Sequence, residues 1–239
     1  RDYTSIQVAN SASSAFTATA SSLATAGNHS ITVTSLAKPQ RLLSDTTWSA
    51  TDDTVSSSDI TLTLAASGTG TGITAGTISV SSTSSTPAGV VSAINAANLG
   101  ISAYLQYTGS AYQIMVTGPE GASNGFTLSS SDTTNLPFAS SNLQDSCDAV
   151  LTVDGVAITS SSNAVTDALT GVTLNLTTTT AANTPITLTV SNDTVSARPK
   201  VDAMVKAYND LYALYKEQTA SSMDVATRGI LNSDFGVSS

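Results

Sequence analysis

Positive charge is scarce in this 239-residue sequence and is missing from its middle. Lys and Arg number 8 against 17 Asp and Glu, and neither Lys nor Arg occurs between Arg41 and Arg198. Phosphate backbones and anionic lipid headgroups are bound mainly by these two side chains. We therefore expect neither nucleic acid nor a membrane as a partner. The phosphate-binding patterns GxGxxG and GxxxxGK[ST] are absent as well, so no nucleotide cofactor is expected.

Cysteine, histidine and tryptophan occur once each, and this scarcity argues against an enzyme or a metalloprotein. The lone Cys147 excludes an internal disulfide framework, and zinc needs three or four Cys, His or carboxylate ligands. The one histidine, His29, is next to Ser30 and near Asp45, but a Ser-His-Asp set from these residues exists only on paper, and we interpret His29 as a solvated or strand-edge residue. The sequence predicts no catalytic residue, no cofactor and no metal ligand.

Acidic residues cluster at Asp52, Asp53 and Asp59, but their spacing matches no EF-hand loop, so we interpret them as a solvated turn. No apolar run approaches the roughly 18 to 20 residues of a membrane-spanning helix. A signal-peptide pattern and an initiator Met are also missing from the start. Ser, Thr, Ala, Gly and Val dominate, as in exported surface proteins. We expect a secreted fragment of a longer protein whose export signal lies elsewhere or is of another kind.

Short runs of alternating apolar and polar residues predict a mainly β fold. The first run is Ser30 to Leu36, after which Pro39 marks a bend or an edge. Beyond Cys147, Asp154-Gly155 lies between two apolar runs and predicts a tight hairpin. The other expected strands are 60–64, 78–80, 104–107, 112–116, 126–128, 172–176 and 186–190.

Two short helices are predicted among these strands. Thr86 is a suitable N-cap, Pro87 suits the first helical position, and an apolar stripe follows. A second short helix is expected over 164–169. Each helix precedes a glycine, Gly100 or Gly171, and then an alternating strand, so we interpret the two stretches as related modules.

The last segment differs because charge of both signs returns there. From Val201 to Tyr215, apolar residues recur at spacings of three and four, which is a heptad-like seam typical of a coiled coil. An isolated helix of this length is marginal in water, so its stability must come mostly from burying the seam. Two hypotheses stay open: the seam packs against other helices, or it packs only on its own domain. The predicted packing residues are Val201, Met204, Val205, Tyr208, Leu211 and Tyr215.

Three stretches of the sequence carry motifs. Residues 31–40 read I-x-V-T-x-L-A-x-x-Q, the second stretch is residues 151–158 with 162–163 and 167–176, and residues 205–211 read V-x-A-Y-N-x-L, with G-x-L-x-x-D following within residues 228–234. In the same order, these stretches resemble the bacterial flagellar filament cap proteins, also called hook-associated protein 2, and the second is similar to a repeat of flagellin-like and hook-associated proteins.

The resemblance implies an α+β fold that is mainly β with short helices. It implies two β-rich head domains, the outer inserted into the inner, and the first helix of a leg domain, in a fragment without the family's terminal helical regions. We expect the inner head domain over 1–48 and 147–195, the outer over 49–146, and the start of the leg over 196–239.

The resemblance further implies a non-enzymatic homo-oligomeric cap at the extracellular tip of the flagellum. Such a cap promotes the folding and insertion of exported flagellin, so its partners would be further copies of itself, flagellin and the filament tip. The helix would then pack first against leg helices of its own chain. Export through the flagellar channel would explain the absence of a signal peptide.

A secreted surface adhesin or glycan-binding β module is the alternative hypothesis, because β-rich exported domains often bind host sugars. Residues 49–146 would then carry the site, and host surface glycans or mucin would be partners. Glycan binding that is lost on removal of these residues, with filament growth intact, would favour this alternative.

Overall fold

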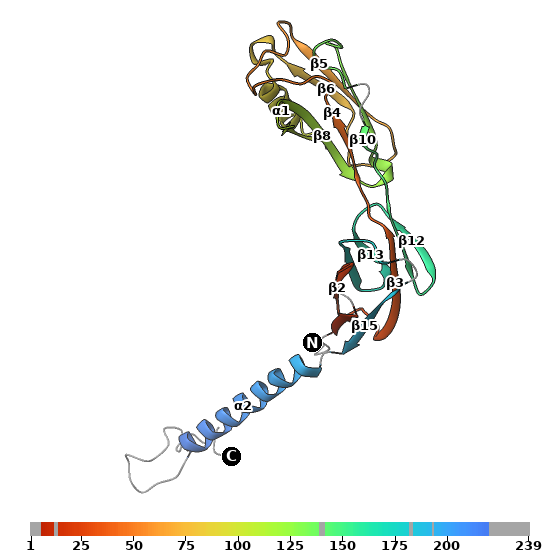
Figure 1. Cartoon of the computed structure of the whole chain (residues 1–239). Coiled ribbons are helices and arrows are strands. Elements are labelled where there is room, and N and C mark those ends of the chain that lie inside the picture. Colours follow the sequence, from red (N-terminus) through yellow and green to blue (C-terminus); the bar gives the residue numbers. More distant parts are fainter. Residues whose placement is uncertain (1–5, 12–13, 139–141, 182–183, 193, 220–239) are drawn as a thin grey trace. The chain divides into compact units, whose positions relative to one another are not determined.

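The structure is a computed structural model that describes residues 6–11, 14–138, 142–181, 184–192 and 194–219. It contains 15 strands, two α-helices and two short 3₁₀ helices, Ser82–Ser84 and Ala122–Asn124. These elements fall into two units: a body from Val8 to Val190, and a second unit that contains α2 (Thr194–Thr219). The expected mainly β fold with helices is confirmed (Figure 1).

Two sheets of the body are formed from residues near its two ends. A five-stranded sheet has the order β1-β15-β3-β11-β12, and a three-stranded sheet has the order β13-β14-β2. Alternating apolar residues form these strands because every second side chain points into the core. Their bounds are Ile6–Asn10 (β1), Phe16–Ala20 (β2), Gly27–Ser35 (β3), Ala149–Val153 (β11), Val156–Ser160 (β12), Ala164–Leu169 (β13), Val172–Leu176 (β14) and Ile186–Asn192 (β15).

The other two sheets of the body are formed by the intervening residues. One has the order β10-β4-β8-β7 and the other the order β6-β5-β9, and α1 (Pro87–Ala96) packs against β6, β7 and β8. Figure 1 shows this group of elements together. The strand bounds are Pro39–Leu43 (β4), Ile60–Ala66 (β5), Gly76–Val80 (β6), Ser102–Tyr107 (β7), Tyr112–Glu120 (β8), Phe126–Ser130 (β9) and Asn142–Gln144 (β10).

The predicted helix at residue 87 is confirmed as α1. Thr86 has an extended backbone, and its side-chain oxygen accepts a hydrogen bond of 3.1 Å from the N–H of Gly89, which satisfies one free donor of the first turn. Val90 and Ile94 are fully buried in an apolar core that also contains Leu62. The helix is therefore held by its own region of the body.

The predicted hairpin at Asp154-Gly155 is confirmed as well. The backbone φ angles of these two residues are +52° and +84°, which is the left-handed pair that a two-residue turn between twisted strands needs. The turn places Val153 opposite Val156 and joins β11 to β12. The local sequence therefore determines the register of this strand pair.

The predicted helix over 164–169 is wrong, because these residues form strand β13, which pairs with β14. Val165 and Leu169 are four positions apart, a spacing that puts two side chains on one face of a helix and equally on one face of a strand. The register of the pair with β14 shifts between these two residues. The two stretches are therefore not two copies of one helix-glycine-strand module, because only the first contains a helix. What the two stretches share is a left-handed glycine: Gly100 has φ +85° and Gly171 has φ +74°.

Strand β3 pairs with β11 across the intervening residues, with Leu151 opposite Val33. Strand β4, which the expected boundary at residue 48 assigns to the inner head domain, pairs instead with β8, where Leu42 lies opposite Val116. The chain changes sheets earlier than expected because the pairing between Lys38 and Cys147 separates the two sheet systems.

Candidate assembly surface

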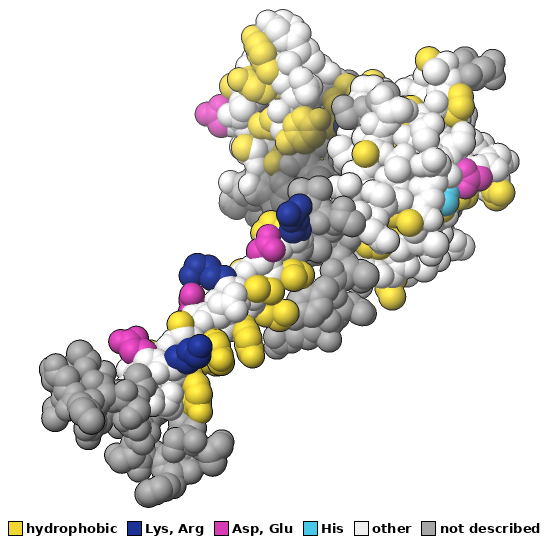
Figure 2. Space-filling view, turned by 90° about the horizontal axis from the view of Figure 1, so that it is seen from below, with side chains coloured by type: hydrophobic (Ala, Val, Ile, Leu, Met, Phe, Trp, Pro, Cys, Tyr) yellow, Lys and Arg dark blue, Asp and Glu magenta, His cyan; other side chains and the backbone are white. Residues whose placement is uncertain are grey.

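The apolar side chains of α2 are exposed. Tyr208 and Leu211 keep 67% and 65% of their surface, whereas Ile94 of α1 keeps none. Figure 2 shows hydrophobic side chains along this helix. All six residues of the predicted packing seam lie on α2, and their exposed fractions range from 43% to 67%. The exposed apolar residues of α2 are Val201, Met204, Val205, Tyr208, Leu211, Tyr212, Leu214 and Tyr215.

Two of these residues, Tyr212 and Leu214, were not predicted. Tyr212 follows Tyr208 by four positions, so the two side chains lie on the same face of the helix. This spacing in the sequence is the signal that predicts Tyr212 as a seam residue. Its ring also carries the Lys216 ammonium at 5.3 Å from the ring centroid, a cation–π contact. The seam is therefore wider than a strict two-position heptad stripe.

Charged side chains occupy other positions of α2 and pair one turn apart. The Lys206 ammonium lies 2.7 Å from the Asp210 carboxylate, and Arg198 lies 4.0 Å from Asp202. All four side chains are well exposed, so each pair stabilises the helix by only about 0.3–0.5 kcal/mol. These pairs support the helix and leave its apolar face available for packing.

The carboxylate partner of the single histidine, His29, is Asp154 and not Asp45, the residue considered in the sequence analysis. His29 Nδ1 lies 2.8 Å from Asp154 Oδ2, and the N–H of Ser30 donates to Asp154 Oδ1. These two hydrogen bonds, that from His29 first, hold the pKa of the Asp154 carboxyl below its usual range. The contacts tie the β11–β12 hairpin to β3, which is a structural role.

Two of the three clustered acidic residues, Asp53 and Asp59, accept hydrogen bonds from backbone N–H groups. Asp53 accepts from the N–H of Ala50, and Asp59 accepts from the N–H of Ser82 at 2.7 Å. This hydrogen bond lowers the pKa of the Asp59 carboxyl. Among the residues that the structure describes, no group of three or more His, Cys, Asp and Glu side chains could hold a metal ion.

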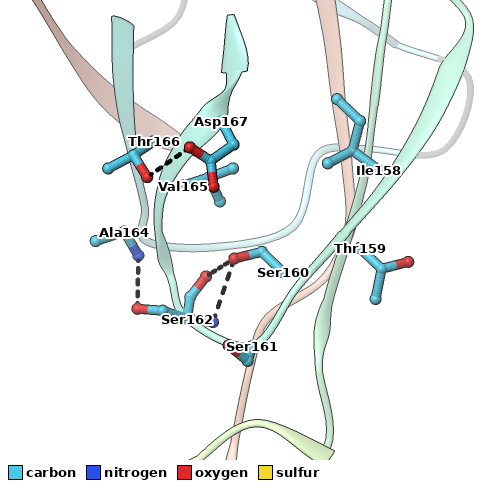
Figure 3. Close-up of a pocket in the computed structure, with 9 residues that line it drawn as sticks. All are labelled: Ile158, Thr159, Ser160, Ser161, Ser162, Ala164, Val165, Thr166 and Asp167. Carbon is cyan, nitrogen blue, oxygen red and sulfur yellow. Dashed lines mark hydrogen bonds between the residues drawn. The ribbon is translucent and has the colours of Figure 1, made fainter.

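A cavity of about 400 Å³ lies between β12 and β13 (Figure 3). Its polar groups bond one another: the N–H of Ser162 donates to Ser160 Oγ at 3.2 Å, and the N–H of Ala164 donates to Ser162 Oγ at 3.2 Å. Thr166 donates to Asp167, the one carboxylate in the lining. Proton transfer needs a second titratable group, and this lining has none.

No helix in the described part of the chain combines the length and apolarity that a membrane crossing requires. Eight of the large apolar side chains that are exposed in the described part of the chain lie on α2, and exposed apolar patches of this kind mark interaction sites.

Solved structures define the class to which this fold belongs, the flagellar cap proteins. One similar structure is that of the D1-D2-D3 domains of the flagellar cap protein FliD from Escherichia coli. The match covers 98% of this chain and 66% of the FliD chain, with a TM-score of 0.80 and 32% identity. The D2-D3 domains of the same protein match over 80% of this chain and 100% of theirs, with a TM-score of 0.68 and 34% identity.

The sequence gives the same result. A family model described as the C-terminus of flagellar hook-associated protein 2 matches residues 146–239. Flagellar hook-associated protein 2 of Escherichia coli O157:H7 is 38% identical over 172 residues, which is 66% of this chain and 36% of that protein. The chain belongs to the flagellar hook-associated protein 2 family.

This chain spans 16% to 36% of the length of curated relatives that it matches. The relatives and structures named above are hook-associated or cap proteins, so they support the first hypothesis from the sequence. They give no support to the alternative of an adhesin that binds host glycans or mucin.

Proposed function

We propose that this chain works in a structural cap at the distal end of the bacterial flagellar filament. The cap assembles from several copies and promotes the folding and insertion of exported flagellin, so it acts outside the cell at the filament tip. Its partners are further copies of itself, flagellin and the filament end. It acts through shape and subunit contacts and carries out no bond chemistry. The observation that carries this proposal is the match of 98% of the chain to a flagellar cap protein structure.

The proposed domain organisation has an outer β-rich head domain inserted into an inner one. Two separate cores support it: one apolar cluster contains buried residues between Leu42 and Phe138, whereas Ile31, Leu151 and Leu188 are fully buried outside that cluster. We propose that the first boundary lies near Lys38 instead of residue 48 and that the second stays at Cys147; the pairing of β4 with β8 and of Lys38 with Cys147 supports this choice. Residues 196–239, with most of α2, begin the helical leg.

The proposed role of α2 is to pack its exposed face against other helices of the leg. Complete burial of a Val, Leu or Met side chain contributes about 1.5–3 kcal/mol. Val201, Met204 and Leu211 are each 47–65% exposed, so much of this free energy is still to be gained. A helix with charged pairs on its remaining surface can bury this face without leaving a charge unpaired.

Complementation of a strain that lacks this protein tests the proposal. We expect the deletion to leave flagellin in the medium and cells without normal filaments, and the unaltered gene to restore filaments. The double variant Tyr208→Asp with Leu211→Asp should fail to restore them, because two carboxylates cannot be buried in a helix seam. The measurement is filament length by electron microscopy together with flagellin in the culture supernatant.

The matched control places the same two charges elsewhere on the same helix, as Asn209→Asp with Ala213→Asp. Both positions are exposed and lie away from the seam, so this variant should restore filaments. Normal filaments in the deletion strain would overturn the cap function. Normal filaments with the seam variant alone would overturn only the role of α2.

A further inference from the structure

The two sheet systems of the body are joined by two passages of the chain. At the crossing, the N–H of Lys38 donates to the carbonyl of Cys147 at 2.8 Å, and the N–H of Cys147 donates to the carbonyl of Lys38 at 3.1 Å. A ribbon of two strands twists more freely than a wider sheet. The two passages alone therefore do not fix the orientation of one sheet system relative to the other.

Near the crossing, the N–H of Ala122 also donates to Asp148 Oδ1 at 2.6 Å. A third connection, away from the two passages, is made by Glu120, the last residue of β8. Its Oε1 accepts hydrogen bonds from the Ser162 hydroxyl at 2.7 Å and from the N–H of Asn163 at 2.9 Å. Its Oε2 accepts from Asn163 Nδ2 at 2.7 Å. Hydrogen bonds to a carboxylate are about twice as strong as those between neutral groups. One side chain of the outer sheet system thus holds the turn between β12 and β13.

Asn163 extends this connection to the first chain passage. Its Oδ1 accepts from the N–H of Ala37, and its Nδ2 donates to the carbonyl of Ala37, both at 2.9 Å. The amide therefore pairs with Ala37 as a strand neighbour would, while it also bonds Glu120. Three segments that are far apart in sequence meet at one side chain.

Gly121 allows the close approach that these bonds need. Its φ is +102°, and a Cβ at this position would lie 2.7 Å from the carbonyl oxygen of Ser161, closer than real side chains come. Glycine is the residue that accepts both this backbone angle and this contact.

We propose that Glu120 and Asn163 form an orienting latch, which fixes the outer sheet system (residues 39–144) in one orientation relative to the sheets formed by residues 8–35 and 149–190. The latch acts as a positioning device, since two strand passages plus a third point of attachment remove the bending and twisting that the passages alone permit. The inference rests on these contacts and is independent of the cap function.

The test is a distance distribution between two spin labels, measured by pulsed electron resonance on the whole chain. Labels are attached at Ser110→Cys and Thr159→Cys, both exposed and one in each sheet system, with Cys147→Ser in every sample to remove the native thiol. The otherwise unaltered chain should give one narrow peak. Glu120→Ala and Asn163→Ala should each lose that peak and give a broad distribution.

Two further variants keep the test decisive. Glu120→Gln retains one acceptor oxygen, so it should broaden the peak less than Glu120→Ala, and it serves if the alanine variant does not fold. Glu217→Ala removes a carboxylate from α2 and should leave the peak narrow. A narrow peak at the same distance in folded Glu120→Ala and Asn163→Ala would overturn the proposal, as would equal broadening in Glu217→Ala.

Discussion

The two α-helices in the described part of the chain both carry an apolar stripe, but one buries this stripe and the other exposes it. Helix α1 has 10 residues and no charged side chain, and it buries Val90 and Ile94 completely. Helix α2 has 26 residues with charged pairs, and it exposes its apolar side chains, such as Tyr208 at 67%. The comparison teaches that an apolar stripe identifies which face of a helix packs. Which element packs against that face depends on the neighbouring strands and helices of the fold.

The largest difference should appear when each helix loses one apolar side chain. Ile94→Ala leaves a cavity in the core beside α1 and should lower the free energy of unfolding by about 2–5 kcal/mol. Met204→Ala on α2 should change it by less than about 0.5 kcal/mol in the monomeric chain, because that side chain is already 60% exposed. Urea denaturation measures both, and equal losses in the two variants would break the comparison.

A smaller effect is expected at the start of α1. Thr86→Ala removes the oxygen that accepts from the N–H of Gly89 and should lower the free energy of unfolding by about 1 kcal/mol. The control Ser92→Ala changes an exposed position within the same helix and should have almost no effect. If both variants gave the same denaturation midpoint, local capping would not be needed to hold α1 on the body.

Acid should weaken the body through Asp132, whose pKa is lowered to about 2 mainly by hydrogen bonds from the side chain and N–H of Asn135. The unfolded value is 3.8, so this contribution is present above about pH 4 and is lost as pH falls towards 2. It stays below about 1 kcal/mol because solvent screens the carboxylate.

Thermal unfolding at a series of pH values from roughly 2 to 5 measures this contribution. Asp132→Asn and Asn135→Ala should each reduce the loss of melting temperature on acidification. An unchanged slope in both variants would show that this loop does not couple folding to protonation.

The smallest effect is expected on α2. Asp210→Asn removes the partner of Lys206 and should destabilise the helix by about 0.3–0.5 kcal/mol at low salt. Circular dichroism should show a slight loss of helix that disappears at high salt, because ions screen an exposed pair. A loss that persists in high salt would point to a packing role for Asp210.

Local sequence signals predicted the elements whose causes are local. Thr86-Pro87 begins α1, and Asp154-Gly155 makes the β11–β12 turn, because capping and positive φ angles depend on the residues themselves. The prediction of a helix over 164–169 is wrong because residues four positions apart, such as Val165 and Leu169, share one face in a strand as well as in a helix. Periodicity alone does not separate these two cases.

Contacts between distant residues could not be predicted in the same way. Glu120 and Asn163 are 43 positions apart, and neither belongs to a pattern that anticipates their meeting. Strand β4 pairs with β8, which is distant in sequence, because Leu42 of β4 is buried in the same apolar core as the residues of β8. The residues next to β4 in the sequence do not indicate this pairing. The apolar face of α2, by contrast, follows from residue spacing, while its partner stays a proposal.

Hydrogen exchange of the α2 backbone amides, in the dilute monomer and in the assembled cap, tests the central claim most directly. The account predicts fast exchange between residues 201 and 215 in the monomer and strong protection in the assembly, whereas Ile94 and its neighbours in α1 are protected in both. Equal protection of α2 in the two states would contradict the account, and so would an α2 that stays unprotected after assembly.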